Sequence, residues 1–446
     1  MVRKHLLPPD HDGVALIDTG TQESITYAAL RTRVSRRAEA LSSLTGDIVF
    51  LGAATGVPTV VDYLALTEIG ATVAMLDPST PSDSLNRWTA AYEPAAWWGF
   101  DHRPETRSGS ERMTPREEAA LLPTSGSTGN PRFVRLSMDN LMVNAQQIRD
   151  ALRISPIERA LAHLPLYYSY GLSVLNSHLI AGATLVLCRD AAVRPEFWRA
   201  MHEYKVTSVS GVPYHYEIFI RTGLLSLDLP DLRHLTQAGG RMPADRITQV
   251  HEAMSPRGVD LWIMYGQTEA TARISVLPPE DLDGGLGSVG MAVPGGTLGI
   301  DTSQCQDVGE VVFTGPNVML GYAAGLSDLE QGDLQHGVLR TGDVGRLDAN
   351  GRLWVTGRLK RIAKVFGTRM NLDDLEVQLG PFGRVAIIED SDRLAVFVEA
   401  GRAPIDLARR MERAMRLPYG SIRVHLVAAL PTMASGKIDH HQLRAG

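Results

Sequence analysis

Residues 122–132 read Leu-Pro-Thr-Ser-Gly-Ser-Thr-Gly-Asn-Pro-Arg. Glycines let a backbone approach an anion closely and point several N–H groups at it, and hydroxyl side chains add short donors. This stretch therefore predicts a phosphate-binding loop, with Arg132 as its cation, although a solvated Ser/Gly turn is the open alternative. It lacks the G-x-x-x-x-G-K-[S/T] pattern of a P-loop, which argues against an ordinary nucleotide triphosphatase. The candidate phosphate ligands are Thr124, Ser125, Gly126, Ser127, Thr128, Gly129 and Arg132.

Around this loop, short apolar runs alternate with segments of helical character. Such alternation predicts an α/β fold with layered sheets and much parallel pairing. The predicted strands are 47–52, 72–76, 184–187, 206–210 and 261–265, and the predicted helices are 57–71 and 138–152.

The C-terminal third differs in its residue composition and in the length of its predicted strands. Glycine-rich sequence with short strands, such as 309–313 and 352–355, predicts a β-rich lobe between about residues 285 and 356. A charged segment follows Arg358, and then comes a small α+β unit. We therefore expect a large domain over 1–358 and a small, mobile domain over 359–446, with the boundary at Leu359-Lys360. In the small domain we expect strands at 385–388 and 394–398 and a helix at 405–415.

Composition excludes several classes of function. The chain of 446 residues is 44% hydrophobic and 21% charged, with a net charge of −6 and no long basic run, which argues against nucleic acid as its main partner. No apolar run approaches the roughly 20 residues of a membrane span. Two cysteines far apart, Cys188 and Cys305, favour a reducing, cytoplasmic setting in which both are small buried hydrophobes.

Three other motifs resemble functional sites but lack their context. Residues 285–290 satisfy G-x-G-x-x-G, yet no strand precedes them and no helix follows, so we do not expect a dinucleotide site. Ser435-Gly436-Lys437 lacks the upstream glycine and the final hydroxyl of a P-loop. His440 and His441 have no Cys or carboxylate at metal-ligand spacing, so we expect a solvated surface pair.

Read in order, the polar motifs form a familiar series. Six further motifs follow the loop at 124–132. They are His-Leu-Pro-Leu-Tyr-Tyr-Ser-Tyr-Gly at 163–171, Gln-Ala-Gly-Gly-Arg-Met-Pro at 237–243, Met-Tyr-Gly-Gln-Thr-Glu at 264–269, Arg-Thr-Gly-Asp at 340–343, Gly-Arg-Leu-Lys at 357–360 and Leu-Pro-Thr-Met-Ala-Ser-Gly-Lys at 430–437. From about residue 25 onward, the chain resembles the adenylate-forming superfamily of acyl- and aryl-CoA synthetases, peptide-synthetase adenylation domains and luciferases.

The resemblance implies that a substrate carboxylate attacks the α-phosphate of ATP, releasing pyrophosphate and leaving an acyl adenylate. The loop at 124–129 would then hold the β- and γ-phosphates. The family usually has lysine where this chain has Arg132, which keeps the charge but offers a bidentate fork. Thr268 would bond a phosphate oxygen, and Glu269 would coordinate Mg²⁺, a hard cation that prefers carboxylate oxygen.

The resemblance also implies how the nucleotide and the reacting centre are bound. Asp343 would accept the ribose hydroxyls, with Arg358 assisting from the hinge side, and Lys437 would bridge the carboxylate and the α-phosphate. After adenylation the small domain would swing about Leu359-Lys360, and a phosphopantetheine thiol would enter beside Gly367. Further residues implied in nucleotide binding are Gly239, Gly240, Arg241, Tyr265, Gly266 and Gln267.

The acyl pocket should be walled by residues 163–172, 212–216 and 238–240, with Tyr168, Tyr170, Val212, Ala238 and Gly239 as its candidate lining. Tyrosines are dense here, in a chain with only 6% aromatic residues, which favours a flat aryl or unsaturated acid. The alternative is that some of these tyrosines belong to the core or to an interface.

The expected cofactors are ATP and Mg²⁺, and the expected acceptor is the thiol of CoA or of a carrier-protein phosphopantetheine. The stretch 80–120 and the small domain both look short for this superfamily, so a free amine or other nitrogen nucleophile remains an alternative acceptor. The expected partners are a small carboxylic acid and, for the carrier-linked reaction, an acyl carrier protein.

Overall fold

The computed structural model describes residues 6–8, 11–101, 106–107, 117–123, 132–223, 227–303, 308–365, 368–390, 393–399, 403–415, 417–433 and 438–445. The chain divides into two compact units, which are described separately. Unit 1 comprises residues 1–286, 290–297 and 313–339, and unit 2 comprises 287–289, 298–312 and 340–446.

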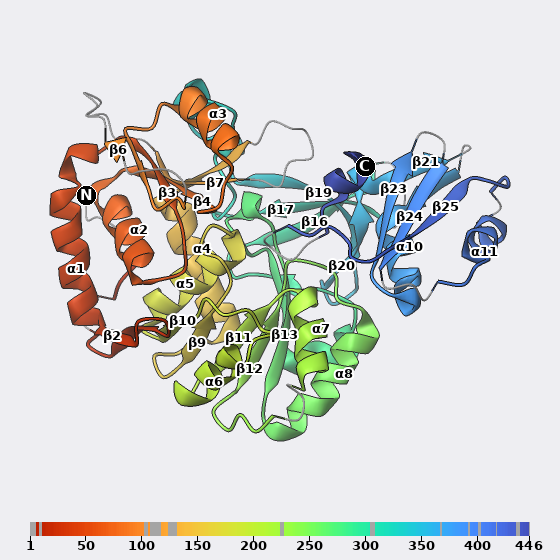
Figure 1. Cartoon of the computed structure of the whole chain (residues 1–446), viewed down its shortest axis with the longest axis horizontal. Coiled ribbons are helices and arrows are strands. Elements are labelled where there is room, and N and C mark those ends of the chain that lie inside the picture. The colour runs from red at the N-terminus through yellow and green to blue at the C-terminus, as the bar shows by residue number, and fades with distance from the viewer. Residues whose placement is uncertain are drawn as a thin grey trace. The chain divides into compact units, whose positions relative to one another are not determined.

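A sheet of nine described strands forms the larger layer of unit 1 (Figure 1). Its middle strands are parallel, as expected from the alternation of strands and helices, while β2, β14 and β15 pair antiparallel at the edges. In spatial order it contains β15 (Met291–Ala292), β14 (Ser275–Leu277), β13 (Asp260–Tyr265), β12 (His234–Gln237), β11 (Ser208–Gly211), β9 (Arg159–Ala162), β10 (Thr184–Leu187), β1 (Val14–Asp18) and β2 (Glu23–Thr26).

A second sheet of seven described strands completes the strand layers of unit 1. Its edge strand β18 comes from far along the chain and pairs antiparallel with β8. In order the strands are β18 (Gly321–Ala323), β8 (Phe133–Ser137), β7 (Glu118–Pro123), β4 (Thr72–Leu76), β3 (Ile48–Gly52), β5 (Ala96–Trp98) and β6 (Thr106–Arg107).

The helices of unit 1 pack on these sheets. They are α1 (Tyr27–Ala40), α2 (Val57–Ile69), α3 (Ser82–Tyr92), α4 (Met138–Leu152), α5 (Ser169–Ala181), α6 (Pro195–Glu203), α7 (Pro213–Thr222), α8 (Ala244–Met254) and α9 (Leu282–Gly285). The sequence-based predictions of α2 and α4 are confirmed; α2 ends earlier than expected because Gly70 adopts φ +76°, a left-handed C-cap.

The two faces of β11, β12 and β13 differ in character, because successive side chains in a strand point to opposite faces. Val209, Leu235 and Leu261 belong to an apolar core shared with α6, α7 and α8, and Cys188 is buried in the same core, as predicted. The opposite face carries Ser208, Ser210, His234, Thr236, Trp262 and Met264, which line a cavity together with residues of α4 and α5. α4 and α5 lie side by side (Figure 1).

Unit 2 combines a four-stranded sheet with an α+β module. The four-stranded sheet contains β16 (Thr297–Asp301), β17 (Gly309–Thr314), β19 (Val338–Leu347) and β20 (Leu353–Arg358). The strands of the module are the β21–β22 hairpin (Ile362–Val365, Thr368–Asn371) and a sheet of β23 (Val385–Asp390), β24 (Arg393–Glu399) and β25 (Ile422–Val427). Its helices are α10 (Leu372–Gln378), α11 (Leu407–Ala414) and α12 (His440–Ala445).

The β-rich lobe expected within the large domain therefore groups largely with the C-terminal unit. This division by contacts differs from a boundary at Leu359-Lys360, because β19 and β20 pair antiparallel just before that point and their sheet lies mainly in unit 2. The division by contacts does not test whether the small domain rotates about Leu359-Lys360, and that rotation stays a prediction.

The expected absence of a dinucleotide site at 285–290 agrees with the local structure. Gly285 ends the four-residue α9, and the short strand β15 follows Gly290. Gly287 and Gly290 adopt φ +91° and +77°, so this is a glycine turn and not a strand-to-helix junction.

Candidate active site

The Tyr265–Glu269 motif lies where the parallel strand β13 ends. The chain leaves β13 at Tyr265 and forms one short 3₁₀ turn over Thr268–Ala270. Ligands of open α/β sheets bind outside the carboxyl ends of the strands. The predicted phosphate and metal residues therefore occupy the edge of the sheet where a nucleotide is expected.

Both polar side chains of the Thr268–Glu269 turn are held by hydroxyl groups from other elements. The Thr268 Oγ1 and Ser169 Oγ atoms are 3.0 Å apart, at the start of α5. The Tyr322 hydroxyl donates to Glu269 Oε1 at 2.7 Å. Glu269 is only half-buried, so its carboxylate is positioned by the protein and still accessible to a ligand.

The backbone of this turn is tightly specified. A Cβ on Gly266 would lie 1.8 Å from the Ala272 carbonyl oxygen, so only glycine fits there. Thr271 adopts φ +64°, a rare conformation for a β-branched residue, and its hydroxyl donates to the Asn317 carbonyl at 2.7 Å. Such strain persists only where surrounding contacts fix it, and it is typical of functional sites.

Arg132 lies near the same turn. It immediately precedes β8, and β8 pairs with β18 so that Val134 stands opposite Tyr322. The positive charge of Arg132 acts on the Tyr322 hydroxyl and opposes the rise in its pKa that burial, as the main cause, and Glu269 produce. The structure thus brings together Arg132, Tyr322 and Glu269. The preceding residues Thr124, Ser125, Gly126, Ser127, Thr128 and Gly129 lie outside the described part of the chain.

Gly239 and Gly240 follow β12 and form a shelf without side chains. Gly239 adopts φ +80°, and a Cβ there would lie 2.6 Å from the Tyr168 hydroxyl and 2.9 Å from Val212 Cγ1. A glycine is thus required, because Tyr168 and Val212 occupy the space in which a side chain would begin. Ala238 is buried next to this shelf, while Arg241 is exposed.

The tyrosines predicted to wall the acyl pocket have different environments. Tyr168 is half-buried, and burial raises its pKa to about 12. Tyr170 is buried, and its hydroxyl lies 2.9 Å from Thr236 Oγ1. Tyr216 belongs to the apolar core on the α6–α8 side, and Tyr214 is 40% exposed. The core alternative therefore holds for Tyr216, whereas Tyr168 and Tyr170 stay beside the predicted site.

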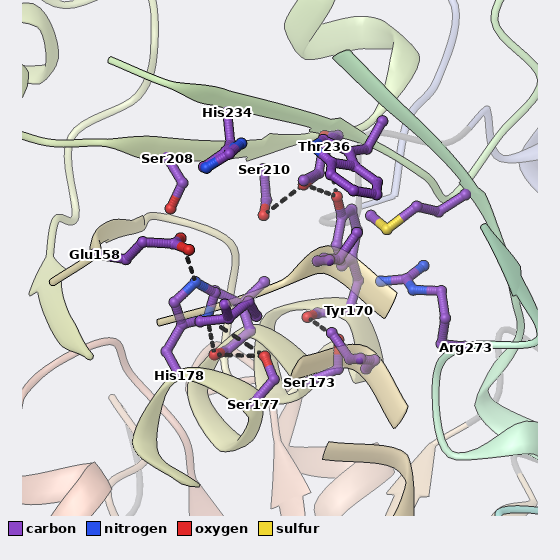
Figure 2. A pocket seen from close by; sticks show the side chains of 16 residues that line it. Glu158, Tyr170, Ser173, Ser177, His178, Ser208, Ser210, His234, Thr236 and Arg273 are labelled. Atoms are coloured by element: carbon purple, nitrogen blue, oxygen red, sulfur yellow. Dashed lines mark hydrogen bonds and ion pairs between the residues drawn. The ribbon is translucent and has the colours of Figure 1, made fainter. Parts of the chain in front are cut away.

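Tyr170 also lines a narrow cavity between the sheet and helices α4 and α5 (Figure 2). The cavity has about 20 Å³ of space for the centre of a water molecule, enough for one or two waters. Its lining includes Ser210, Thr236 and Arg273, and the Arg273 guanidinium lies over the Tyr170 ring, 4.8 Å from its centroid. Arg273 could not be predicted from the sequence as part of a site, because its burial depends on tertiary packing.

A pair of histidines supports the ends of the strands. His163 donates from Nε2 to the Ser210 carbonyl at 2.6 Å, and its ring meets that of His215 edge-on at 4.9 Å between centroids. Burial lowers the pKa of His163 to about 4 and that of His215 to about 3. Both rings are therefore neutral at pH 7, and the buried site carries no extra charge from them.

In unit 2 the expected ribose residues meet across a hairpin. Asp343 on β19 stands opposite Arg358 on β20, and Arg358 Nε donates to Asp343 Oδ1 at 2.9 Å. The Asp343 carboxylate is buried, whereas the Arg358 side chain is 60% exposed. A carboxylate is an acceptor suited to two hydroxyl groups, and the arginine fixes its orientation. Gly367 and Lys437 lie outside the described residues.

One expectation about the small module is wrong. His440 is not a solvated surface histidine, because its Nε2 lies 3.0 Å from Glu376 Oε1 and the ring is half-buried. The same carboxylate accepts from Arg361 Nη2 and from the Ile387 backbone N–H. Glu376 thus joins three segments of the module. The sequence could not show this contact, because 64 positions separate His440 from Glu376.

The donor set around Glu269 fits a magnesium ion that is bound together with phosphate. Mg²⁺ in phosphate-transfer sites takes one or two carboxylates, waters and substrate oxygens. Among the described residues, no group of three or more His, Cys, Asp and Glu side chains is placed to hold a metal. A metal at Glu269 would therefore depend on the phosphates of the nucleotide for most of its remaining ligands.

Within the described residues, no helix is long and apolar enough to cross a bilayer.

Comparison with known proteins agrees with this arrangement. The family model described as AMP-binding enzyme matches residues 87–323. Indoleacetate–CoA ligase from Aromatoleum aromaticum (strain DSM 19018 / LMG 30748 / EbN1) is 32% identical over 320 residues, which span 68% of this chain but 60% of that ligase.

Solved structures show the same fold over almost the whole chain. The o-succinylbenzoate CoA synthetase (MenE) from Bacillus subtilis gives a TM-score of 0.79 at 23% identity, covering 97% of this chain and 95% of that one. The amide bond synthetase McbA from Marinactinospora thermotolerans gives 0.80 at 25% identity, covering 98% and 97%. The α/β fold class is confirmed, and the chain belongs to the AMP-binding family of adenylate-forming enzymes.

Proposed function

We propose that the protein activates a carboxylic acid with ATP and then transfers the acyl group to a thiol. In the first step a carboxylate oxygen of the acid bonds to the α-phosphorus, and the bond from that phosphorus to pyrophosphate breaks. In the second step a thiolate sulfur bonds to the acyl carbon, and AMP leaves. CoA is the proposed acceptor, and the phosphopantetheine of a carrier protein offers the same thiol.

The observation that carries the proposal is the Thr268–Glu269 turn at the end of β13. The Tyr322 hydroxyl donates to Glu269, and the charge of Arg132 acts on the same hydroxyl, so one carboxylate and one cation would flank the expected phosphates. When bound, Mg²⁺ would neutralise charge on the phosphates, and Glu269 would hold it. Fixed donors and charges of this kind stabilise charge that moves onto leaving pyrophosphate.

The remaining residues have roles in binding and positioning. Asp343 would accept the ribose hydroxyls, and Arg358 would orient that carboxylate. Gly239 and Gly240 would support adenine on one side and, with Ala238, leave room for the acyl group. Lys437 would bridge the reacting carboxylate and the α-phosphate, where a cation is worth most in a closed site of low dielectric.

The acid is proposed to be flat, either aryl or unsaturated. Tyr168 and Tyr170 lie beside the predicted site, and aromatic rings suit contact with a planar group. The similarity to a protein named indoleacetate–CoA ligase supports an aryl acid. A cytoplasmic site of action is part of the proposal and rests on the low cysteine content.

A nitrogen acceptor is the second candidate. Its support is the structural likeness to an amide bond synthetase, which keeps the same fold over nearly the full chain. Product masses from two reactions separate the candidates: ATP and acid with CoA, and ATP and acid with a panel of amines. A thioester product supports the first candidate, and an amide formed without thioester supports the second.

The activation step is tested by acid-dependent exchange of labelled pyrophosphate into ATP, with aryl, fatty and amino acids. We expect exchange with at least one acid and its loss in Glu269→Gln. No exchange with any acid of a broad panel would overturn the proposed function.

A further inference from the structure

We propose that the acid substrate carries a second anionic group, such as a distal carboxylate, which the Arg273 guanidinium binds inside the cavity of Figure 2. This inference rests on the proposed function and deepens it, because it names a chemical class of acid and the residue that selects it.

The cavity is connected to the predicted acyl-pocket residues through β11 and β12. On β11 and β12, Ser210 and Thr236 are paired across the strands and line the cavity. Val212 and Ala238, which were predicted to line the pocket, come two residues later, just beyond the ends of β11 and β12, where the Ala238 N–H still donates to the Gly211 carbonyl at 3.1 Å. Residues two apart share a face and lie about 7 Å apart along a strand. A group that extends inward from Ala238 therefore reaches Ser210 and Thr236.

The cavity is also close to the predicted phosphate site. Tyr170 lines the cavity, and the preceding residue, Ser169, contacts the Thr268 hydroxyl at 3.0 Å. Arg273 follows the Thr268–Glu269 turn by a few residues and lines the same cavity. One end of a short acid can thus lie at the reacting centre while its other end points toward Arg273.

Arg273 is a buried cation without a matching anion. Its residue surface is 2% exposed, and no carboxylate within the described ranges forms an ion pair with it. Among the described residues, the Arg273 guanidinium lies over the face of the Tyr170 ring, and its Nε is buried without a hydrogen-bond partner. Leaving a guanidinium so poorly compensated is costly, whereas a carboxylate would satisfy its planar fork.

A second donor points to the same class of ligand. Trp262 also lines this cavity, its indole Nε1 is buried without a hydrogen-bond partner in the described structure, and an indole N–H can only donate. The Thr236 hydroxyl already donates to Ser210 Oγ at 2.9 Å, and it also lies 2.9 Å from the Tyr170 hydroxyl. The cavity therefore presents unused donors from Arg273 and Trp262, which is what a carboxylate requires.

The one carboxyl group of the lining lies at the other end. Figure 2 shows Glu158 beside His178 and Ser208, on the side of the cavity away from Arg273. His178 Nε2 is 3.9 Å from Glu158 Oε2. Since the cavity is narrow, it suits the terminal group of the acid, and the rest of the acid would lie toward the predicted pocket residues Val212 and Ala238.

The test compares matched acids in pyrophosphate exchange: cinnamate with 4-carboxycinnamate, and butyrate with succinate. We expect the wild type to favour the dicarboxylate of at least one pair by about 10- to 100-fold in kcat/KM, the effect of one charge-assisted contact. Arg273→Met should remove this preference and keep exchange with the monocarboxylate. Arg273→Lys, which keeps the charge, should restore part of the preference.

Arg153→Met is the matched control. Arg153 lies over the ring of Trp262 at 5.5 Å, but it is exposed and paired with Glu280, so its loss should leave the selectivity unchanged. Two results would overturn this inference: a preference for the monocarboxylate in every pair, or an equal loss of kcat/KM with both acids in Arg273→Met. In either case, the exchange that is observed would still support the proposed function. No exchange with any acid would instead overturn the proposed function.

Discussion

At the scale of single residues, the geometry of the candidate site depends on side chains that have no motif of their own. Tyr322 fixes Glu269 across 53 positions of sequence, and Ser169 contacts Thr268 across 99. Arg273 is buried against Tyr170 because the turn at 268–271 directs the chain back under α5. Distances in sequence of this size carry no local signal, so these contacts are visible only in the folded chain.

Removing the Tyr322 hydroxyl should weaken metal use. In Tyr322→Phe, Glu269 loses its hydrogen bond at 2.7 Å and is less well oriented toward Mg²⁺. Outer contacts of this kind are typically worth about 10- to 100-fold in metal affinity or activity. Pyrophosphate exchange titrated with Mg²⁺ should show a higher half-saturating concentration. The exposed Tyr214→Phe is the control, and an unchanged titration in Tyr322→Phe would contradict the role of the hydroxyl.

Glu158 should make stability depend on pH. Burial raises the pKa of Glu158 to about 7, so between pH 4.5 and 7 the folded state keeps a proton that the unfolded state releases. The contribution of Glu158 to the free energy of unfolding is therefore fully present below pH 4.5 and is lost as the pH rises through 7. Because Glu158→Gln does not titrate, its free energy of unfolding relative to wild type should rise by about 2 to 3 kcal/mol from pH 5 to pH 8.

Urea melts of both proteins at the two pH values measure this difference. Glu280→Gln serves as the control, since Glu280 is exposed and its own backbone and Arg153 lower its pKa. Its relative stability should not rise with pH. A pH-independent difference for Glu158→Gln would show that the carboxyl group is not destabilised when charged.

At the scale of elements, local signals explain most of what the sequence predicted correctly. Strands such as β3, β4 and β13 are continuous apolar runs, and α4 starts with a complete capping box in which Ser137 and Asn140 bond each other's backbone. The short strands β14, β15 and β18 escaped prediction because two or three residues carry no periodicity. The grouping of β19 and β20 with unit 2 depends on contacts between elements, which neither strand's own sequence encodes.

The capping box of α4 offers a graded test. Ser137→Ala removes one cap bond and should lower the free energy of unfolding by about 1 kcal/mol. Asn140→Ala should be more damaging, because Asn140 Nδ2 also donates to the Pro316 and Val318 carbonyls at 2.8 and 2.9 Å. Thermal melts should rank the variants in this order. Equal losses would mean that the contacts to 316–318 contribute nothing measurable.

At the scale of the whole molecule, the proposed reaction distributes its residues over two compact units. Thr268 and Glu269 belong to unit 1, whereas Asp343, Arg358 and Lys437 belong to unit 2. The division of labour between Lys437 in adenylation and the region of Gly367 in thiol transfer came from the family resemblance and stays a prediction, since both residues lie outside the described part.

Lys437→Ala separates the two steps. It should abolish adenylation, measured as acid-dependent pyrophosphate exchange, because the bridging cation is lost from the reacting centre. Thioester formation from supplied acyl adenylate and CoA should continue at a rate close to that of the wild type, because the proposed division gives Lys437 no role in that step. Equal loss of both activities would refute the division, and thermal melts establish that the variant is folded.

The position of β18 has a consequence for how the protein is made. β18 closes one edge of a sheet whose other described strands lie between residues 48 and 137, and Asn140 bonds Val318 across 178 positions. During synthesis the ribosome must therefore deliver residue 323 before β8 gains its outer neighbour. Until then the nascent chain exposes an unpaired strand edge, the kind of surface that chaperones shield. Refolding of the full-length chain should be slow for the same reason, since distant pairings must form before the seven-stranded sheet is complete.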